Sequence, residues 1–200
     1  MVKYVYDFSE GDKSMKDLLG GKGANLAEMT KLGLPVPPGF TITTEACRAY
    51  LQGSVVPESL STEVTTALRG VEDQMERHLG DPYNPLLVSV RSGAKFSMPG
   101  MMETVLNIGL NDQSVIGLAK VSGNERFAWD SYRRLIQMFG KTVLDIDGDL
   151  FSDALDSLKA ERGVKGDTEL TADDLRGLVE TFKGIVRDQT GQDFPQDPRT

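Results

Sequence analysis

The chain has 200 residues, of which 39% are hydrophobic and 26% charged, so it suits one large domain or two small ones. Its net charge of −8 argues against a general nucleic-acid-binding protein, because a phosphate backbone needs a basic surface. No stretch approaches the roughly 20 apolar residues of a membrane span, and the N-terminus lacks the pattern of a signal peptide. We therefore expect neither nucleic acid nor membrane as a partner.

The chain contains one histidine and one cysteine, and neither makes a site by itself. A single histidine, His78, excludes a histidine-rich metal site. His78 falls at the end of an amphipathic pattern, where it would favour the helix dipole, so we assign it a structural role. Cys47 is expected to be a small buried core thiol. A lone cysteine excludes an intramolecular disulfide and fits a reducing compartment, so we expect a cytoplasmic protein.

The first 85 residues show both strand and helix patterns. Apolar and aromatic residues recur in 2–8 and in 40–43, which predicts two strands. Helices are expected where apolar residues recur at spacings of three and four, and glycine then ends the first and third of them. The expected helices are 24–32, 44–51 and 60–79.

The second part of the chain becomes helical. A short apolar run at 86–90 is typical of a strand buried on both faces, and 105–110 predicts another strand. Capping-box spacing joins Ser122 to Glu125 and Thr171 to Asp174. The helices expected beyond Asn111 are 112–121, 124–139, 149–162 and 171–190.

These patterns predict an α+β fold. An α/β lobe with a short mixed sheet would occupy residues 1–111, and an all-helical subdomain would occupy residues 112–197. Residues 198–200 would begin a connection to further structure.

Two stretches suit an anionic ligand. Arg91 follows the apolar run 86–90 and enters a loop with glycines and hydroxyls, where its planar fork could bind an anion. Local pattern leaves open that it caps the strand by pairing with a carboxylate. Lys22 lies in Gly-Gly-Lys-Gly at a helix start, where unpaired amides favour anions. This is neither a P-loop nor a GxGxxG motif, and a solvated loop lysine is the alternative.

Three motifs in fixed order carry a family resemblance. They are GGKGANLAEM from Gly20, LGLPVPPGFTITT from Leu32 and SVRSG from Ser89. Together they resemble the N-terminal ATP-grasp region of the phosphoenolpyruvate-utilising dikinases. SMPGMMET at 97–104 and FAWDSYRRLIQMF at 127–139 are similar to pyruvate, phosphate dikinase within that family.

The resemblance implies a partial ATP-grasp fold and a set of contacts to the phosphates of ATP. Those contacts would be Lys22, Arg91, Gly100, Met101, Met102, Thr104 and Arg134, with the loop residues offering backbone amides. Pattern alone favours the other interpretation of Arg134, a surface arginine beside Arg133. The resemblance places no catalytic residue and no metal ligand in this chain, so the ligands of Mg²⁺ are expected elsewhere.

The resemblance also implies a reaction. The whole protein would convert ATP, pyruvate and phosphate to AMP, phosphoenolpyruvate and diphosphate through a phosphohistidine outside this chain. It would be a homodimer, whereas these 200 residues alone would be an inactive monomer that lacks its partner domains. The alternatives are a phosphoenolpyruvate synthase or related phosphotransferase, or a stand-alone nucleotide-binding module.

Overall fold

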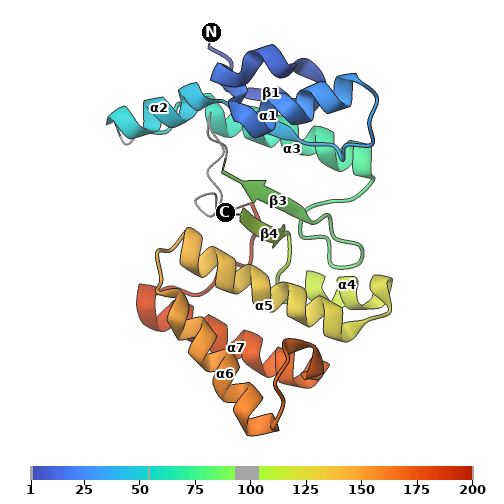
Figure 1. Ribbon diagram of the computed structural model, residues 1–200, viewed down its shortest axis with the longest axis vertical. Coiled ribbons are helices and arrows are strands. Elements are labelled where there is room, and N and C mark those ends of the chain that lie inside the picture. Colours follow the sequence, from blue (N-terminus) through green and yellow to red (C-terminus); the bar gives the residue numbers. More distant parts are fainter. Residues whose placement is uncertain (1, 54, 93–103, 200) are drawn as a thin grey trace. The chain divides into compact units, whose positions relative to one another are not determined.

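A computed structural model describes residues 2–53, 55–92 and 104–199 (Figure 1). The described chain forms two compact units, each with more contacts inside it than outside. Of the described residues, the first unit holds 2–53, 55–76 and 92, and the second holds 77–91 and 104–199.

The first unit combines a two-stranded sheet with three α-helices. Strand β1 (Val5–Asp7) pairs antiparallel with β2 (Phe40–Ile42), so that Val5 lies opposite Ile42. Glu63 on α3 (Leu60–Met75) ties this sheet to the helix, because its Oε2 accepts hydrogen bonds from the amides of Tyr4 at 2.7 Å and Val5 at 3.0 Å. The helices are α1 (Lys16–Lys31), α2 (Thr44–Gly53) and α3 (Leu60–Met75).

The core of the first unit is built mainly from small side chains. Its buried hydrophobic residues are Val5, Leu19, Ala24, Ala27, Ala46 and Val71. Gly23 lets α1 approach β2 closely, since a Cβ there would lie 2.8 Å from Cγ2 of Thr41. This core therefore depends on close backbone approach more than on large side chains.

The second unit combines a β-hairpin with four helices, of which α5 (Glu125–Thr142) packs against the hairpin. Strands β3 (Val88–Arg91) and β4 (Thr104–Ile108) pair antiparallel, and β4 runs antiparallel to the neighbouring helix α5 (Figure 1). The helices are α4 (Ser114–Ser122), α5 (Glu125–Thr142), α6 (Gly148–Arg162) and α7 (Ala172–Thr190). All four predicted helices are confirmed to within three residues at each end.

A continuous core of large side chains fills this second unit. Tyr132 and Ile136 of α5, Phe151 of α6 and Phe182 of α7 are fully buried, and the Phe151 and Phe182 rings meet edge to face at 5.0 Å. Phe194, beyond α7, closes the core against the ring of Tyr132 at 6.1 Å. Burial of this size is the main source of the unit's stability.

Helices combined with two small antiparallel sheets confirm the α+β class. In the described residues the expected single mixed sheet is instead two separate antiparallel pairs. The hairpin belongs to the same compact unit as the later helices. The division into an α/β lobe and a helical subdomain near residue 111 therefore stays a prediction and is not the boundary between the two units.

Helix α3 is shorter than expected. It ends at Met75 because Glu76 adopts a left-handed conformation with φ 51°. His78 consequently lies in the loop that follows, where its carbonyl accepts the amides of Asp81 at 3.2 Å and Leu86 at 2.8 Å. The prediction that His78 stabilises a helix end was wrong, since no helical turn surrounds it.

Other local expectations had mixed outcomes. Asn124, rather than Ser122, caps α5 by accepting the amide of Phe127 at 2.9 Å, because α5 begins at Glu125 and Ser122 is still the last residue of α4. The capping box of Thr171 and Asp174 at α7 is confirmed. Cys47 is exposed rather than buried, because α2 turns its neighbour Ala46 inward instead.

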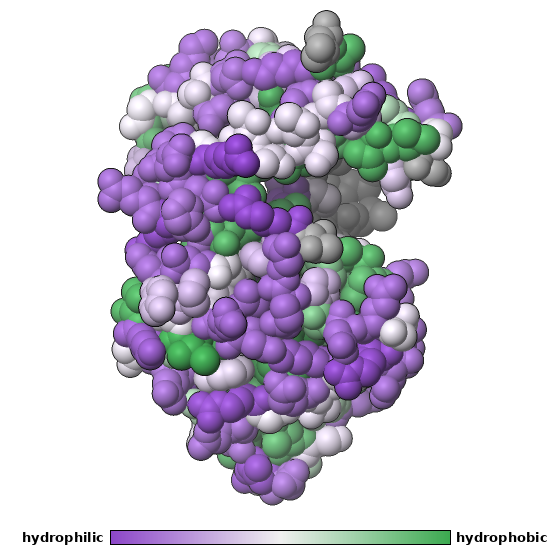
Figure 2. Space-filling view, turned by 180° about the vertical axis from the view of Figure 1, so that it is seen from behind, coloured by the Kyte–Doolittle hydropathy of each residue, from purple (hydrophilic) through white to green (hydrophobic). Residues whose placement is uncertain are grey.

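The surface carries scattered hydrophobic residues. The face in Figure 2 is mostly hydrophilic, with separate hydrophobic patches, which agrees with the charged composition. Within the described parts of the chain, every helix is too short or too polar to cross a membrane.

Candidate functional site

Helix α1 is interrupted at the glycine cluster. Gly20 has φ 70° and ψ 171°, which is not helical, so a second helical segment begins just after it. Gly21, Lys22 and Gly23 form the first turn of that segment, where amides have no acceptor within the helix. The expectation that this cluster starts a helix is therefore confirmed.

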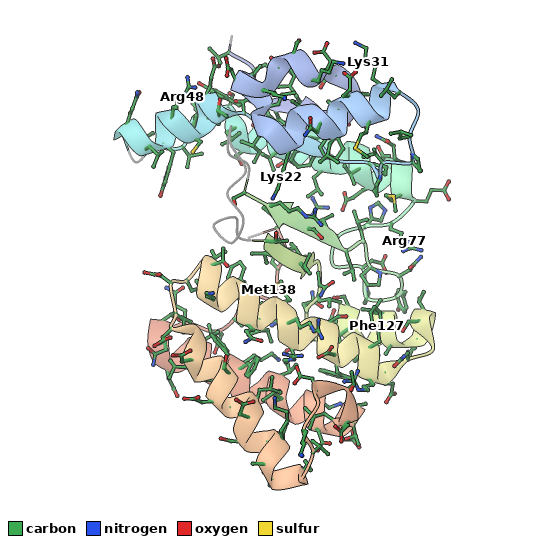
Figure 3. The ribbon with its side chains drawn as sticks, in the orientation of Figure 1. Lys22, Lys31, Arg48, Arg77, Phe127 and Met138 are labelled. Carbon is green, nitrogen blue, oxygen red and sulfur yellow. The ribbon has the colours of Figure 1, made fainter. Side chains whose placement is uncertain are left out.

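The glycines of the cluster have different roles. Gly20 supplies the left-handed turn, and Gly23 makes room for Thr41 of β2. Lys22 is half-buried and projects from α1 (Figure 3). It forms no ion pair with any described residue, so its charge is available to a ligand.

The hairpin brings two of the predicted residues together. Arg91 ends β3 and lies directly opposite Thr104, the first residue of β4. Both therefore stand where the β3–β4 connection leaves and re-enters the sheet. The predicted loop residues Gly100, Met101 and Met102 lie outside the described residues.

Strand β3 is more open than expected. Val90 is 57% exposed and Arg91 is also exposed, so the prediction of a strand buried on both faces was wrong. Burial stops at Leu86, because β3 has a neighbour only on its β4 side among the described strands. Arg91 pairs with no carboxylate in the described chain, which removes the strand-cap alternative there. A guanidinium in this state can donate two parallel hydrogen bonds to one anion.

A bulge in β4 was not predicted. The register shifts between Val88 and Val90, and Asn107 has φ 62°. The Asn107 side-chain amide donates to the carbonyl of Ser131 on α5 at 3.1 Å, which fixes the hairpin on that helix. Asn tolerates the left-handed region better than most residues, and Gly109 with φ 118° follows closely. The Asn-Ile-Gly sequence carried this signal.

Two adjacent arginines on α5 have opposite environments. Arg133 is 3% exposed and donates through Nε to Oδ1 of Asp130 at 3.1 Å. The side chain of Arg134 is 54% exposed, with its Nε 3.0 Å from Oδ2 of the same carboxylate. Asn107 of β4 and Ser131 of α5 are joined by a hydrogen bond, and along their elements they lie three residues from Thr104 and from Arg134, respectively.

Tyr132 could be mistaken for a catalytic hydroxyl. Burial raises the pKa of Tyr132 far above its ordinary value of 10, so the group stays protonated. It donates to Oδ1 of Asp112 at 2.9 Å and accepts from the side-chain amide of Gln196 at 3.2 Å. Asp112 also pairs with Lys183 of α7. This network therefore fastens the core and does not offer a general base.

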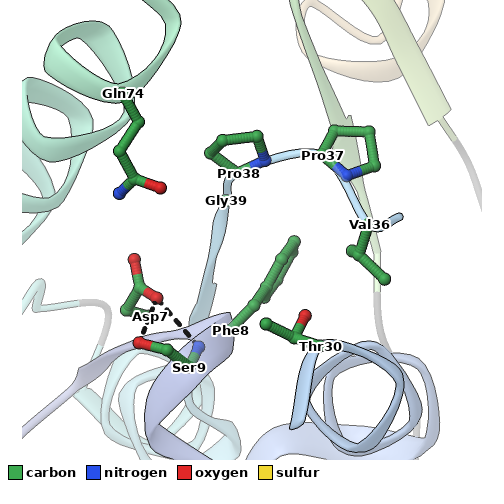
Figure 4. A pocket seen from close by; sticks show the side chains of 9 residues that line it. All are labelled: Asp7, Phe8, Ser9, Thr30, Val36, Pro37, Pro38, Gly39 and Gln74. Atoms are coloured by element: carbon green, nitrogen blue, oxygen red, sulfur yellow. Dashed lines mark hydrogen bonds between the residues drawn. The ribbon is translucent and has the colours of Figure 1, made fainter. Parts of the chain in front are cut away.

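A hollow of about 230 Å³ lies elsewhere, within the first unit (Figure 4). Phe8, Pro37 and Pro38 form its apolar wall. Its carboxylate, Asp7, accepts the amide of Ser9 at 2.8 Å and the Ser9 hydroxyl at 2.7 Å. The nine described lining residues include no lysine or arginine, so this hollow does not suit a phosphate.

Sequence comparison decides the family. The profile described as "Pyruvate phosphate dikinase, AMP/ATP-binding domain" matches residues 16–59 and 51–135. This chain belongs to that family. The match includes Lys22, the hairpin with Arg91 and Thr104, and Arg134.

Relatives in the dikinase family cover nearly the whole chain. It is 56% identical over 191 residues to pyruvate, phosphate dikinase 2 of Oryza sativa subsp. japonica, covering 96% of this chain and 21% of that protein. It is 51% identical over 201 residues to the Clostridium symbiosum enzyme, covering 100% and 23% respectively. The chain thus spans about a fifth of the length of the curated relatives it matches.

The arrangement offers positive charge and backbone amides. Over the described part of this dikinase-family chain, no group of three or more His, Cys, Asp or Glu residues is placed to hold a metal ion. What Arg91, Thr104 and Arg134 can do is bind, orient and neutralise an anionic group.

Proposed function

We propose that this chain supplies the phosphate-contacting part of the ATP site of a pyruvate, phosphate dikinase, in a partial ATP-grasp fold. One observation carries the proposal: Arg91 stands exposed opposite Thr104, without a carboxylate partner among the described residues. A structural arginine at a strand end would be expected to pair with an acid. Membership of an AMP/ATP-binding domain family supports the nucleotide as the ligand.

The proposed chemistry of these residues is electrostatic. Phosphoryl transfer needs little covalent help from the protein and depends on positioning and neutralising the phosphate oxygens. Arg91 would bind two oxygens with its planar fork, and Thr104 would add a hydroxyl donor. Lys22 would contribute a mobile point charge, and Arg134 a second fork. Amides of Gly100, Met101 and Met102 would complete the cradle.

The wider reaction belongs to the whole protein that we propose. ATP, pyruvate and phosphate would give AMP, phosphoenolpyruvate and diphosphate, with the phosphohistidine and the Mg²⁺ ligands outside this chain. The metal would neutralise phosphate charge when bound. The remaining domains would be the partners of this one, in a homodimeric enzyme. The 200-residue chain alone would be a monomer that binds ATP weakly and does not turn over.

A titration of the chain with MgATP, followed by NMR amide shifts, tests this proposal. We expect weak, fast-exchange shifts at Arg91 and Thr104 and their loss in Arg91→Ala. Arg77→Ala is the matched control, because Arg77 is an exposed arginine of the same unit (Figure 3). Absence of shifts at both residues in the unmodified chain would overturn the proposal. Low-micromolar affinity would instead contradict a partial site.

In the longer enzyme, Arg91→Ala should slow ATP-dependent phosphorylation of the protein. Loss of one charge-assisted contact costs about 1.5–3 kcal/mol, which corresponds to roughly one to two decades in rate. An unchanged rate would refute the role of Arg91, whatever the affinity of the isolated chain.

A further inference from the structure

Asp130 stands between the two arginines of α5 and is itself almost fully buried. Its Oδ1 accepts from Arg133, and its Oδ2 lies 3.0 Å from Nε of Arg134. A buried carboxylate is costly unless it is paired, and Arg133 already satisfies that need. The second oxygen is thus left to act on Arg134.

Arg133 makes Asp130 rigid. It also donates to Oε1 of Gln137 at 3.3 Å and approaches Oδ2 of Asp167 at 3.5 Å. Three partners on a buried guanidinium fix its position, and Asp130 is fixed with it. The carboxylate is therefore a stationary support rather than a mobile surface acid.

Arg134 is held on one edge only. Asp130 approaches Nε, and the terminal nitrogens of Arg134 have no ionic or hydrogen-bonding partner in the described part of the chain. Those two nitrogens form the fork that grips a phosphate in bidentate fashion. An exposed arginine loses much rotational freedom when it binds, and prior fixation of Nε reduces that loss.

We propose that Asp130 is a positioning residue for Arg134, which it holds with the terminal fork free for a phosphate group. This inference rests on the proposed function, in which Arg134 contacts the phosphates of ATP. Asp130 touches no ligand and acts only through Arg134, while Arg133 keeps Asp130 in place.

The affinity of Asp130→Asn for an anion distinguishes a positioning role of Asp130 from a purely electrostatic one, because the two roles predict changes of opposite sign. Removing a carboxylate makes the region more positive, which by Coulomb attraction alone would tighten anion binding. Removing the carboxylate that holds Arg134 in place would weaken anion binding. We expect the second effect to dominate, with inorganic tripolyphosphate bound roughly threefold to tenfold more weakly, a usual coupling for contacting residues.

Asp167→Asn is the matched control. It makes the same change of charge and removes the other carboxylate partner of Arg133, but it does not contact Arg134. Both variants should lower the melting temperature if Arg133 is disturbed. Only Asp130→Asn should weaken tripolyphosphate binding, and that loss should disappear when Arg134 is already alanine. Equal affinities for the two variants, or a loss that persists without Arg134, would overturn the proposal.

A measurement on the unmodified chain covers the case in which Asp130→Asn does not fold. NMR relaxation of the Arg134 Nε–Hε group should show a more ordered side chain than that of Arg69, an exposed arginine with no ionic partner among the described residues. If the Nε–Hε groups of Arg134 and Arg69 were equally mobile, Asp130 would not hold Arg134 in place. If tripolyphosphate moves no signal of Arg91, Thr104 or Arg134, the proposed function fails, and this relaxation comparison still decides the role of Asp130.

Discussion

The two compact units differ in how their cores are made. The first buries mostly alanine and valine, and leaves large side chains such as Leu32 and Leu51 exposed. The second buries a continuous set of aromatic and branched side chains across α5, α6 and α7. Since apolar burial supplies most of the free energy of folding, the second unit should be the more stable of the two.

This difference separates the candidate phosphate contacts. Lys22 belongs to the unit with the thin core, on a helix segment that follows a kink. Arg91, Thr104 and Arg134 belong to the unit with the large core. Three of the four candidate contacts named here therefore belong to the unit that we expect to be the more stable one. Four experiments test the difference in stability between the two units.

Phe182→Ala should have the largest effect. The Phe182 side chain is fully buried against Phe151, so its loss leaves a cavity and should cost about 3–5 kcal/mol of unfolding free energy. Denaturant unfolding measures this loss of unfolding free energy, and hydrogen exchange of the α5 and α7 amides locates it. Phe127→Ala is the control, since that ring on α5 is largely exposed (Figure 3) and should cost roughly 1 kcal/mol or less. Similar costs at the two positions would contradict a core centred on Phe182.

Leu19→Ala tests the thin core of the first unit. Leu19 is the largest fully apolar side chain buried there among the described residues, and its removal should cost about 2–3 kcal/mol. Hydrogen exchange of α1 amides should accelerate by roughly the corresponding factor of 30 to 150. Leu51→Ala, at an exposed position of α2, should leave α1 exchange unchanged. If α5 amides exchanged before α1 amides in the unmodified chain, the stability order of the units would be reversed.

A pair of glycine substitutions sharpens the account of close backbone approach. Gly23→Ala would press a methyl group against Thr41 and should destabilise the first unit by about 1–3 kcal/mol. Gly70→Ala, in α3, meets nothing within 4 Å and should stabilise by about 0.5–1 kcal/mol, because alanine favours the helix. Thermal unfolding should show a lower melting temperature for Gly23→Ala and a higher one for Gly70→Ala. A stabilising Gly23→Ala would show that the contact with Thr41 does not limit this core.

The sequence predicted most of the secondary structure, because amphipathic periodicity is strong where a helix packs on a core. Leu175, Leu178 and Val179 of α7 are all buried, as their spacing indicated. The end of α3 was not predicted. A glycine in the left-handed conformation would have indicated a helix end, but here that position is occupied by Glu76. The exposure of β3 was missed because an apolar run does not reveal how many neighbours the strand has.

The candidate site was predictable only in part. Arg91 and Thr104 follow from two separate motifs, and neither motif indicated that the two residues pair across a hairpin. A further motif selects Arg134, but it does not reveal that Arg133 beside it is buried. That difference depends on which side of α5 faces the core, and Trp129, Arg133 and Ile136 at helical spacing carried a weak signal of it. The role of Asp130 depends on both arginines and could not be predicted before their environments were known.

Asp174→Asn should have the smallest effect and a distinctive pH dependence. A hydrogen bond from Arg162 at 2.6 Å, and then those from Thr171, lower the pKa of Asp174 from its ordinary 3.8 to about 2. A lowered pKa means that the ionised form is favoured in the folded chain. The stabilisation is therefore full above about pH 4 and disappears as the pH falls through about 2.

Thermal unfolding from about pH 6 to pH 2 should show a slightly lower melting temperature for Asp174→Asn than for the unmodified chain, and this difference should disappear at the acid end. Asp173→Asn removes a charge from the same helical turn without the Arg162 and Thr171 contacts, so it measures the helix dipole together with the exposed ion pair of Asp173 with Arg176. If the deficit of Asp174→Asn stayed constant down to pH 2, the hydrogen bonds at the start of α7 would not depend on the charge of Asp174, and this part of the second unit would owe its order to apolar packing alone.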